Sequence, residues 1–180
     1  MTRAVCTAMF AVWAAVAAPT LQAQQTIQTA PGTGGSPHVK TTWTIDGAAL
    51  AVDYGRPSLK GRPETQLMPH GQPWRTGADQ PTLLTTDKPL KIGSLTLAPG
   101  TYTINTIPGP SSWQLLVGRN AADWGIPYRP DLEIGRTPMQ LGTTAAPVEL
   151  VSIHIDDTAA GATLRIEWGT ASATIPFTIG

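Results

Sequence analysis

The sequence predicts an all-β protein, built as a β-sandwich or flattened barrel of about nine short, mostly antiparallel strands. Apolar and polar residues alternate at period two along much of the chain, and 18 glycines and 17 prolines separate the alternating runs. No ten-residue stretch combines a helical period with helix caps, which argues against a helix bundle or a coiled coil.

Composition limits the classes of partner. Only 13% of the residues are charged, against roughly 25% in an average domain, and the formal net charge is zero. Nucleic-acid-binding domains typically carry a strongly basic surface. We therefore expect no nucleic-acid partner.

Residues 1–23 are predicted to be a signal peptide. Arg3 supplies a positive charge, residues 4–18 are uncharged and apolar, and Leu21-Gln22-Ala23 offers a small-residue cleavage site. As a helix, the apolar run would span roughly 23 Å, which is short for a hydrocarbon core of about 30 Å. Cleavage is thus favoured over the alternative of a retained anchor. We expect an exported protein, periplasmic or extracellular, with no transmembrane segment after cleavage.

The single cysteine, Cys6, lies in this predicted signal peptide. The mature chain would therefore have no disulfide, metal thiolate or cysteine nucleophile. The three histidines have no second ligand at a usual metal spacing; they are His38, His70 and His154. The sequence accordingly predicts no metal site and no cofactor.

Residues 24–38 are predicted to be a flexible lead-in, because this stretch has one large aliphatic residue, two prolines and three glycines. Residues 39–180 are predicted to form a single β-sandwich domain, in keeping with their length.

The first predicted hairpin joins Val39–Ile45 to Ala48–Tyr54. Apolar residues alternate in both runs, and Asp46-Gly47 between them is a strong signal for a two-residue turn. Three cross-strand pairs would then place the mainly apolar residues on one face. They are Ile45 with Ala48, Trp43 with Leu50, and Thr41 with Val52.

The middle of the chain predicts four further strands. Leu90–Ile92 and Leu95–Leu97 flank Gly93-Ser94 as a short hairpin. Pro99-Gly100 then turns the chain into a strand over residues 101–107, and residues 113–117 return after a loop.

The C-terminal third predicts strands over residues 149–155, 162–168 and 171–179, each with apolar side chains on one face. Gly169-Thr170 is interpreted as a two-residue hairpin turn. That register pairs Trp168 with Ala171, Ile166 with Ala173 and Leu164 with Ile175. It also sets Arg165 opposite Ser152, on the polar face with His154.

Several motifs resemble a known bacterial family. In chain order they are Tyr54–Arg62, Gly71–Ala78, Leu97–Tyr102, Thr106–Pro110 with Trp113, and Trp124-Gly125. Their order and spacing resemble the domain-of-unknown-function family 2911, over about residues 37–179. The resemblance implies an exported bacterial domain of uncharacterised role and carries over no catalytic residue. The chain departs from the family pattern at Asp79-Gln80, where the family often has Asn-Glu.

The long connection from Tyr54 to Asp79 is the candidate ligand-binding region. It carries a local charge of +2, with Arg56, Lys60, Arg62 and Arg75 against Glu64 and Asp79. A guanidinium offers a planar fork that matches a carboxylate or phosphate, and Trp74 could stack on a sugar. The alternative is structural: the arginines would pin the loop to carboxylates and carbonyls, and Trp74 would anchor it.

The preferred functional hypothesis is a non-catalytic binding module for a small anionic or saccharide-like ligand. The predicted ligand-binding residues are Arg56, Lys60, Arg62, Trp74, Arg75 and Asp79. One alternative is a hydrolase that uses loop carboxylates, either Glu64 with Asp79 or Asp131 with Glu133. Another is a structural partner of an envelope protein. No catalytic residue can be assigned, because the sequence contains no nucleophile elbow, P-loop or zinc-protease motif.

Overall fold

The structure is a computed structural model that describes residues 24–119 and 126–180. The predicted signal peptide and the Trp124-Gly125 motif lie outside the described residues. The all-β prediction is confirmed. Within the described part of the chain, ten strands form one antiparallel sheet, and helical structure is limited to α1 (Glu64–Leu67) and a 3-10 turn (Pro130–Leu132).

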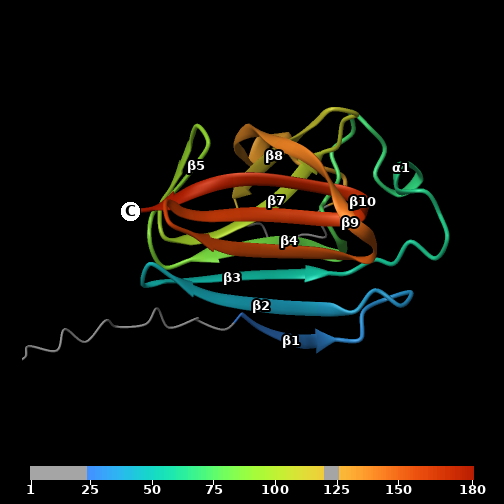
Figure 1. Cartoon of the computed structure of the whole chain (residues 1–180), viewed down its shortest axis with the longest axis horizontal. Coiled ribbons are helices and arrows are strands. Elements are labelled where there is room, and N and C mark those ends of the chain that lie inside the picture. Colours follow the sequence, from blue (N-terminus) through green and yellow to red (C-terminus); the bar gives the residue numbers. More distant parts are fainter. Residues whose placement is uncertain (1–23, 120–125) are drawn as a thin grey trace, which may run out of the picture.

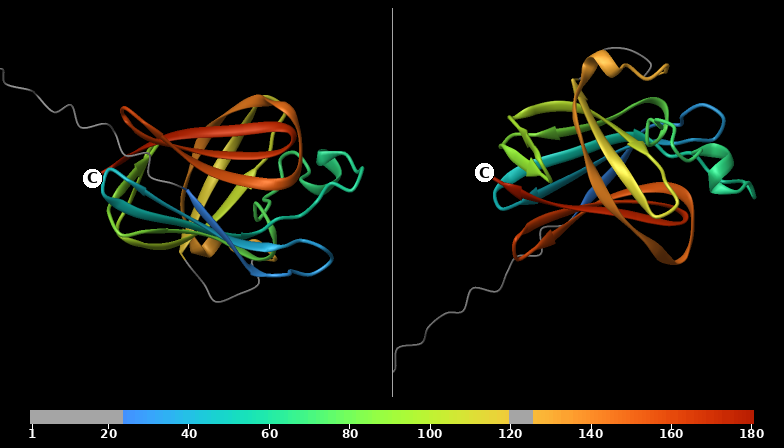
Figure 2. Two further views of the ribbon diagram at one scale, coloured as in Figure 1. Left: turned by 60° about the horizontal axis from the view of Figure 1, so that its bottom comes forward. Right: turned by 90° about the horizontal axis from the view of Figure 1, so that it is seen from above.

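The strands run along the chain as β1 (Gln25–Ala30), β2 (His38–Ile45), β3 (Ala48–Gly55), β4 (Ala78–Thr86), β5 (Leu90–Ile92), β6 (Leu95–Leu97), β7 (Gly100–Ile107), β8 (Ser112–Arg119), β9 (Glu133–Thr158) and β10 (Gly161–Ile179). Their order in the sheet is β1-β2-β3-β4-β7-β8-β9-β10-β5-β6. The sheet curves strongly, so β9 and β10 lie over β2 and β3, and β7 and β8 cross between them (Figures 1 and 2).

The core fills the space inside this curved sheet. Alternation determines which side chains enter it: in β2, Trp43 and Ile45 are buried whereas Lys40 and Thr44 are exposed. The largest fully buried side chains include Trp113 and Trp168, the first on β8 and the second on β10. Burial of such aromatic groups contributes strongly to stability, as a disulfide-free domain requires.

The predicted hairpins in the first two thirds of the chain are confirmed. β2 and β3 pair in the expected register, with Trp43 opposite Leu50. Asp46 and Gly47 both have positive φ, at 49° and 70°, as a type I′ turn requires. β5 and β6 also pair as expected, with Ile92 opposite Leu95.

One difference lies at the N-terminus. The sequence predicts a flexible lead-in over residues 24–38, but the structure has strand β1 there, paired with β2. All six residues of β1 are exposed, so neither of its faces needs an apolar set and the period-two signal is absent. Backbone pairing holds the strand, together with a 3.0 Å hydrogen bond between the Thr26 and Thr41 hydroxyls.

A second difference lies in the C-terminal third, where the predicted turn at Gly169-Thr170 is wrong. β10 continues through this point. Residues 161–174 pair with β9 and residues 177–179 with β5. Ile166 therefore lies opposite Ile153 and not Ala173, and Arg165 opposite His154 and not Ser152. The pairing register shifts on both sides of Gly169, whose φ is +58°. A positive-φ glycine suits a bulge as well as a turn, and the sequence pattern does not separate the two.

Candidate functional site

A cavity of about 500 Å³ opens beside the loop that connects β3 to β4. The β1–β2 turn, the loop and β10 all contribute to its walls. The side chains that matter chemically are Arg62, Trp74, Arg75, Asn105, Tyr128 and Trp168. Among the described residues that line this cavity, none is an aspartate or glutamate.

Trp74 joins the cavity to the core. Its backbone pairs with Thr106 through hydrogen bonds of 2.7 and 2.8 Å, which extend the sheet by one bridge. Its ring stacks on Trp168, with centroids 5.4 Å apart and planes at 8°, and meets the edge of Trp113 at 6.1 Å. Trp74 is therefore the buried loop anchor considered above, and it also lines the cavity.

Arg75 lies half-buried directly after this anchor. Its Nη1 donates a hydrogen bond to the backbone carbonyl of Asp79. Burial lowers the pKa of the guanidinium, and the nearby Asp79 carboxylate acts against this shift. The guanidinium nevertheless stays charged near neutral pH, because its ordinary pKa is above about 12. A desolvated cation at a cavity wall interacts more strongly with an anion than a solvated one does.

Arg62 supplies the second cation of the cavity. Its Nε donates to the Leu59 carbonyl at 2.8 Å and its Nη2 to the Ser58 carbonyl at 2.9 Å. These bonds use two of the five N–H donors of a guanidinium and hold the group in place. Arg62 thus makes the structural contacts of the alternative interpretation and also lines the cavity.

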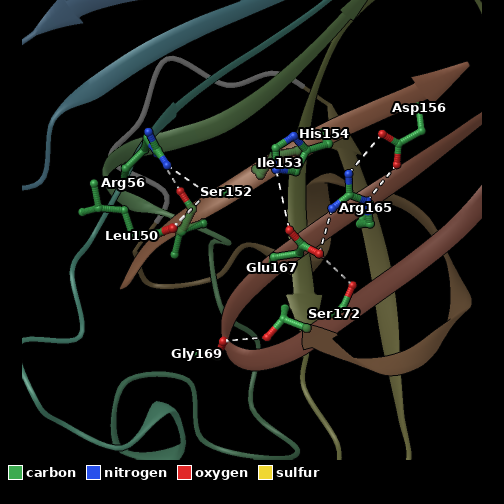
Figure 3. Close-up of polar contacts among 12 residues, drawn as sticks. Arg56, Leu150, Ser152, Ile153, His154, Asp156, Arg165, Glu167, Gly169 and Ser172 are labelled. Atoms are coloured by element: carbon green, nitrogen blue, oxygen red, sulfur yellow. Dashed lines mark hydrogen bonds and ion pairs between the residues drawn. The ribbon is translucent and has the colours of Figure 1, made fainter. Parts of the chain in front are cut away.

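The other three predicted binding residues do not line this cavity. Arg56 points to β9, where its Nε donates to Val151 and its Nη2 to the Ser152 hydroxyl, both at 2.8 Å (Figure 3). The Nζ of Lys60 donates to the Gly34 carbonyl at 2.9 Å. Asp79 lines a neighbouring cavity of about 530 Å³. The structure therefore brings together Arg62, Trp74 and Arg75 of the predicted set.

The predicted binding set lacks three residues of the cavity. Asn105 belongs to an alternating strand, in which a polar residue is expected on the solvent-facing side. Trp168 lies in another alternating strand, in which a large apolar residue is expected in the core. Tyr128 comes from the connection before β9. Its hydroxyl donates to Glu133, which Arg136 also binds at 2.6 and 2.7 Å. Burial and the Glu133 carboxylate raise the pKa of Tyr128, so the phenol stays neutral.

The carboxylates proposed for hydrolysis serve other contacts. Glu64 accepts hydrogen bonds from the backbone N–H of Thr170 at 2.7 Å and from its hydroxyl at 3.2 Å. These contacts lower the pKa of Glu64, mainly through the backbone bond. Asp131 is bound by the Arg129 guanidinium at 2.7 and 2.9 Å. None of these groups lines the cavity with Arg75.

A separate polar network covers the outer face of β9 and β10 (Figure 3). Arg165 binds Asp156 at 2.8 and 3.1 Å and Glu167 at 2.7 Å. His154 Nε2 lies 3.7 Å from Glu167. Burial, followed by the charge of Arg165, lowers the pKa of His154. These groups satisfy one another, which fits a structural role, as expected for side chains on a sheet surface.

The described part of the chain contains no group of three or more His, Cys, Asp and Glu side chains placed to hold a metal ion. Its helical segments are also too short to cross a membrane.

Neither the curated proteins nor the solved structures include a match to this chain. The family model described as "protein of unknown function (DUF2911)" matches residues 36–177. This span covers β2 to β9 and all but the last two residues of β10, and it includes the cavity loop and its Trp74-Arg75 pair. The chain therefore belongs to the DUF2911 family.

Proposed function

We propose that this protein is an exported, non-catalytic binding module that takes a small anionic, saccharide-like ligand into the cavity beside Trp74 and Arg75. The observation that carries the proposal is the combination of two guanidinium groups with aromatic side chains. No carboxylate lies among the described residues that line the same space. The N-terminal sequence supports export, and a mature protein that begins at Gln24 would agree with it.

The cavity walls offer two kinds of contact. Arg62 and Arg75 are suited to a carboxylate or phosphate, which a guanidinium binds through parallel N–H groups. Trp74 and Tyr128 provide apolar ring surface for the C–H groups of a sugar, while the Asn105 amide can donate and accept hydrogen bonds. An acidic sugar or sugar phosphate combines both features.

The geometry favours binding over hydrolysis. A glycosidase needs two carboxyl groups that flank the scissile bond, about 5 to 9.5 Å apart. Glu64 instead accepts hydrogen bonds from Thr170, and Asp79 accepts one from the Thr33 N–H at 2.7 Å while it lines the neighbouring cavity. The hydrolase alternative therefore has no support from the placement of these groups.

Isothermal titration calorimetry tests the proposal. The ligand panel is glucuronate, glucose 6-phosphate and inorganic phosphate, with glucose as the neutral control. We expect binding of an acidic sugar by the wild type and a loss of about tenfold or more in affinity for Asn105→Asp. That change adds a negative charge to the cavity and leaves the Arg75 contacts in place.

Two further variants complete the design. Arg75→Gln should also weaken binding, whereas Arg119→Gln, a change at an exposed arginine that does not line the cavity, should not. Absence of heat with every acidic ligand would refute the proposal. Equal affinities in the wild type and Asn105→Asp would place any binding outside this cavity.

A further inference from the structure

Strand β1 leaves one edge of the sheet open. In the sheet of described strands, β1 pairs with β2 on one side and no strand follows it on the other (Figure 1). An edge strand presents a row of backbone N–H and C=O groups without sheet partners. All six residues of β1 are exposed, and Ile27 in its middle is 52% exposed.

Proteins usually protect such edges by charge, proline, short length or cover. β1 is six residues long, and Gln25–Ala30 contains neither a charged residue nor a proline. The opposite edge is different. β6 has only three residues, and its Leu95 lies so close to Gly135 of β9 that a side chain there would overlap with it. The β6 edge is therefore short and folded against its neighbour, while β1 has neither protection.

We propose that β1 is a self-association strand that pairs antiparallel with β1 of a second copy of this chain. Antiparallel pairing of a strand with its own copy makes a two-fold interface, the commonest symmetry of homodimers. The two Ile27 side chains would lie close together near that axis. Pairing satisfies the open backbone groups and covers the exposed apolar side chain.

Two observations favour a second copy over a foreign peptide. β1 is already ordered by its hydrogen bonds with β2, including that between Thr26 and Thr41, so its copy does not lose the conformational entropy that a free peptide loses. The formal net charge of the chain is zero, so two copies do not repel each other strongly. Pairing of two six-residue strands makes a small interface, and a small interface predicts a weak dimer whose population depends on concentration.

Sedimentation velocity of the purified protein over a range of concentrations tests the proposal. We expect the wild type to shift from the mass of one chain towards that of two as concentration rises. Ile27→Lys should weaken association by about tenfold or more, because it places like charges together at the edge. Ile134→Lys changes another exposed isoleucine, in β9, and should associate like the wild type.

A charge-swap mixture makes the test specific for self-pairing. Ile27→Lys and Ile27→Glu should each remain monomeric alone, and their equimolar mixture should associate, because the opposite charges meet across the two-fold axis. Circular dichroism checks that both variants fold. A wild type that stays monomeric, association that Ile27→Lys leaves unchanged, or a mixture that behaves like the separate variants would overturn the proposal.

Discussion

Trp74 connects two properties of the protein at the scale of a single residue. Its ring stacks on Trp168 and contacts Trp113, while its backbone bridges to β7 through Thr106. The same side chain lines the cavity that holds Arg75. A change at Trp74 should therefore affect both the free energy of unfolding and the shape of the cavity.

Trp74→Ala is expected to lower the free energy of unfolding by about 3–5 kcal/mol, as for other buried aromatic truncations. Trp74→Phe keeps a ring that can stack on Trp168 and should lose clearly less. Chemical denaturation measures both variants. A Trp74→Ala protein within about 1 kcal/mol of the wild type would contradict the role of this ring as an anchor.

The bulge in β10 is the feature that matters at the scale of an element. Gly169 has a φ of +58°, and a Cβ at this position would overlap with the carboxyl group of Glu64. At the bulge, the backbone N–H of Thr170 donates a hydrogen bond to the carboxylate of Glu64. Because Glu64 is the first residue of α1, this bond attaches α1 to β10. The cavity loop thus depends on a backbone irregularity in a strand far from it in sequence.

Gly169→Ala should lower the free energy of unfolding by about 1–2 kcal/mol from its left-handed backbone alone, and by more from the overlap with Glu64. Gly142→Ala is the matched control, because Gly142 lies in β9 opposite Ser172 with normal contact distances and no positive φ. The control should be neutral or slightly stabilising. Thermal and urea unfolding measure both.

A double variant tests the cause. If the overlap with Glu64 contributes, Glu64→Ala combined with Gly169→Ala should cost less than the sum of the two single changes. Additive costs would show that the backbone conformation accounts for the whole effect.

The elements also show what the sequence could predict. The β2–β3 register follows from alternation on two runs and a turn whose conformation only a few residues adopt. β1 has no such signal because both of its faces are solvent-exposed. Gly169 gives an ambiguous signal, since bulges and turns both favour positive φ.

The candidate site was only partly predictable for a related reason. Arg62, Trp74 and Arg75 come from one loop, so local composition found them. Asn105, Tyr128 and Trp168 reach the same cavity from three other parts of the chain. Arg56 is directed to Ser152, 96 residues away, by the curvature of the sheet. Such contacts depend on the three-dimensional fold, and no local pattern encodes them.

At the scale of the whole molecule, ionisable groups favour the folded state at neutral over acidic pH. The pKa of Asp156 is lowered mainly by its hydrogen bonds from Arg165, and that of Glu64 by Thr170. Burial lowers the pKa of His154. In each case the unfolded chain binds the proton more readily than the folded chain does, so stability rises with pH across the range of titration.

The free energy of unfolding should therefore fall as pH decreases from about 7, first through protonation of His154 in the unfolded chain and then of the carboxyl groups. His154→Gln should flatten the decrease between about pH 7 and 5 and leave the lower part in place. Denaturation at fixed pH values measures the profile. Stability that is constant or rising towards pH 4 would contradict this assignment.

The loop from Tyr54 to Asp79 is held by different contacts from those of the charged groups on β9 and β10. Arg56, Lys60, Arg62 and Arg75 each donate at least one hydrogen bond to a main-chain oxygen. A peptide oxygen does not titrate in the physiological pH range, so these contacts do not depend on the protonation of the acceptor. It also carries no net charge, so dissolved salt screens these hydrogen bonds less than it screens a surface ion pair. The loop should consequently keep its shape when the salt concentration or the pH of the medium changes.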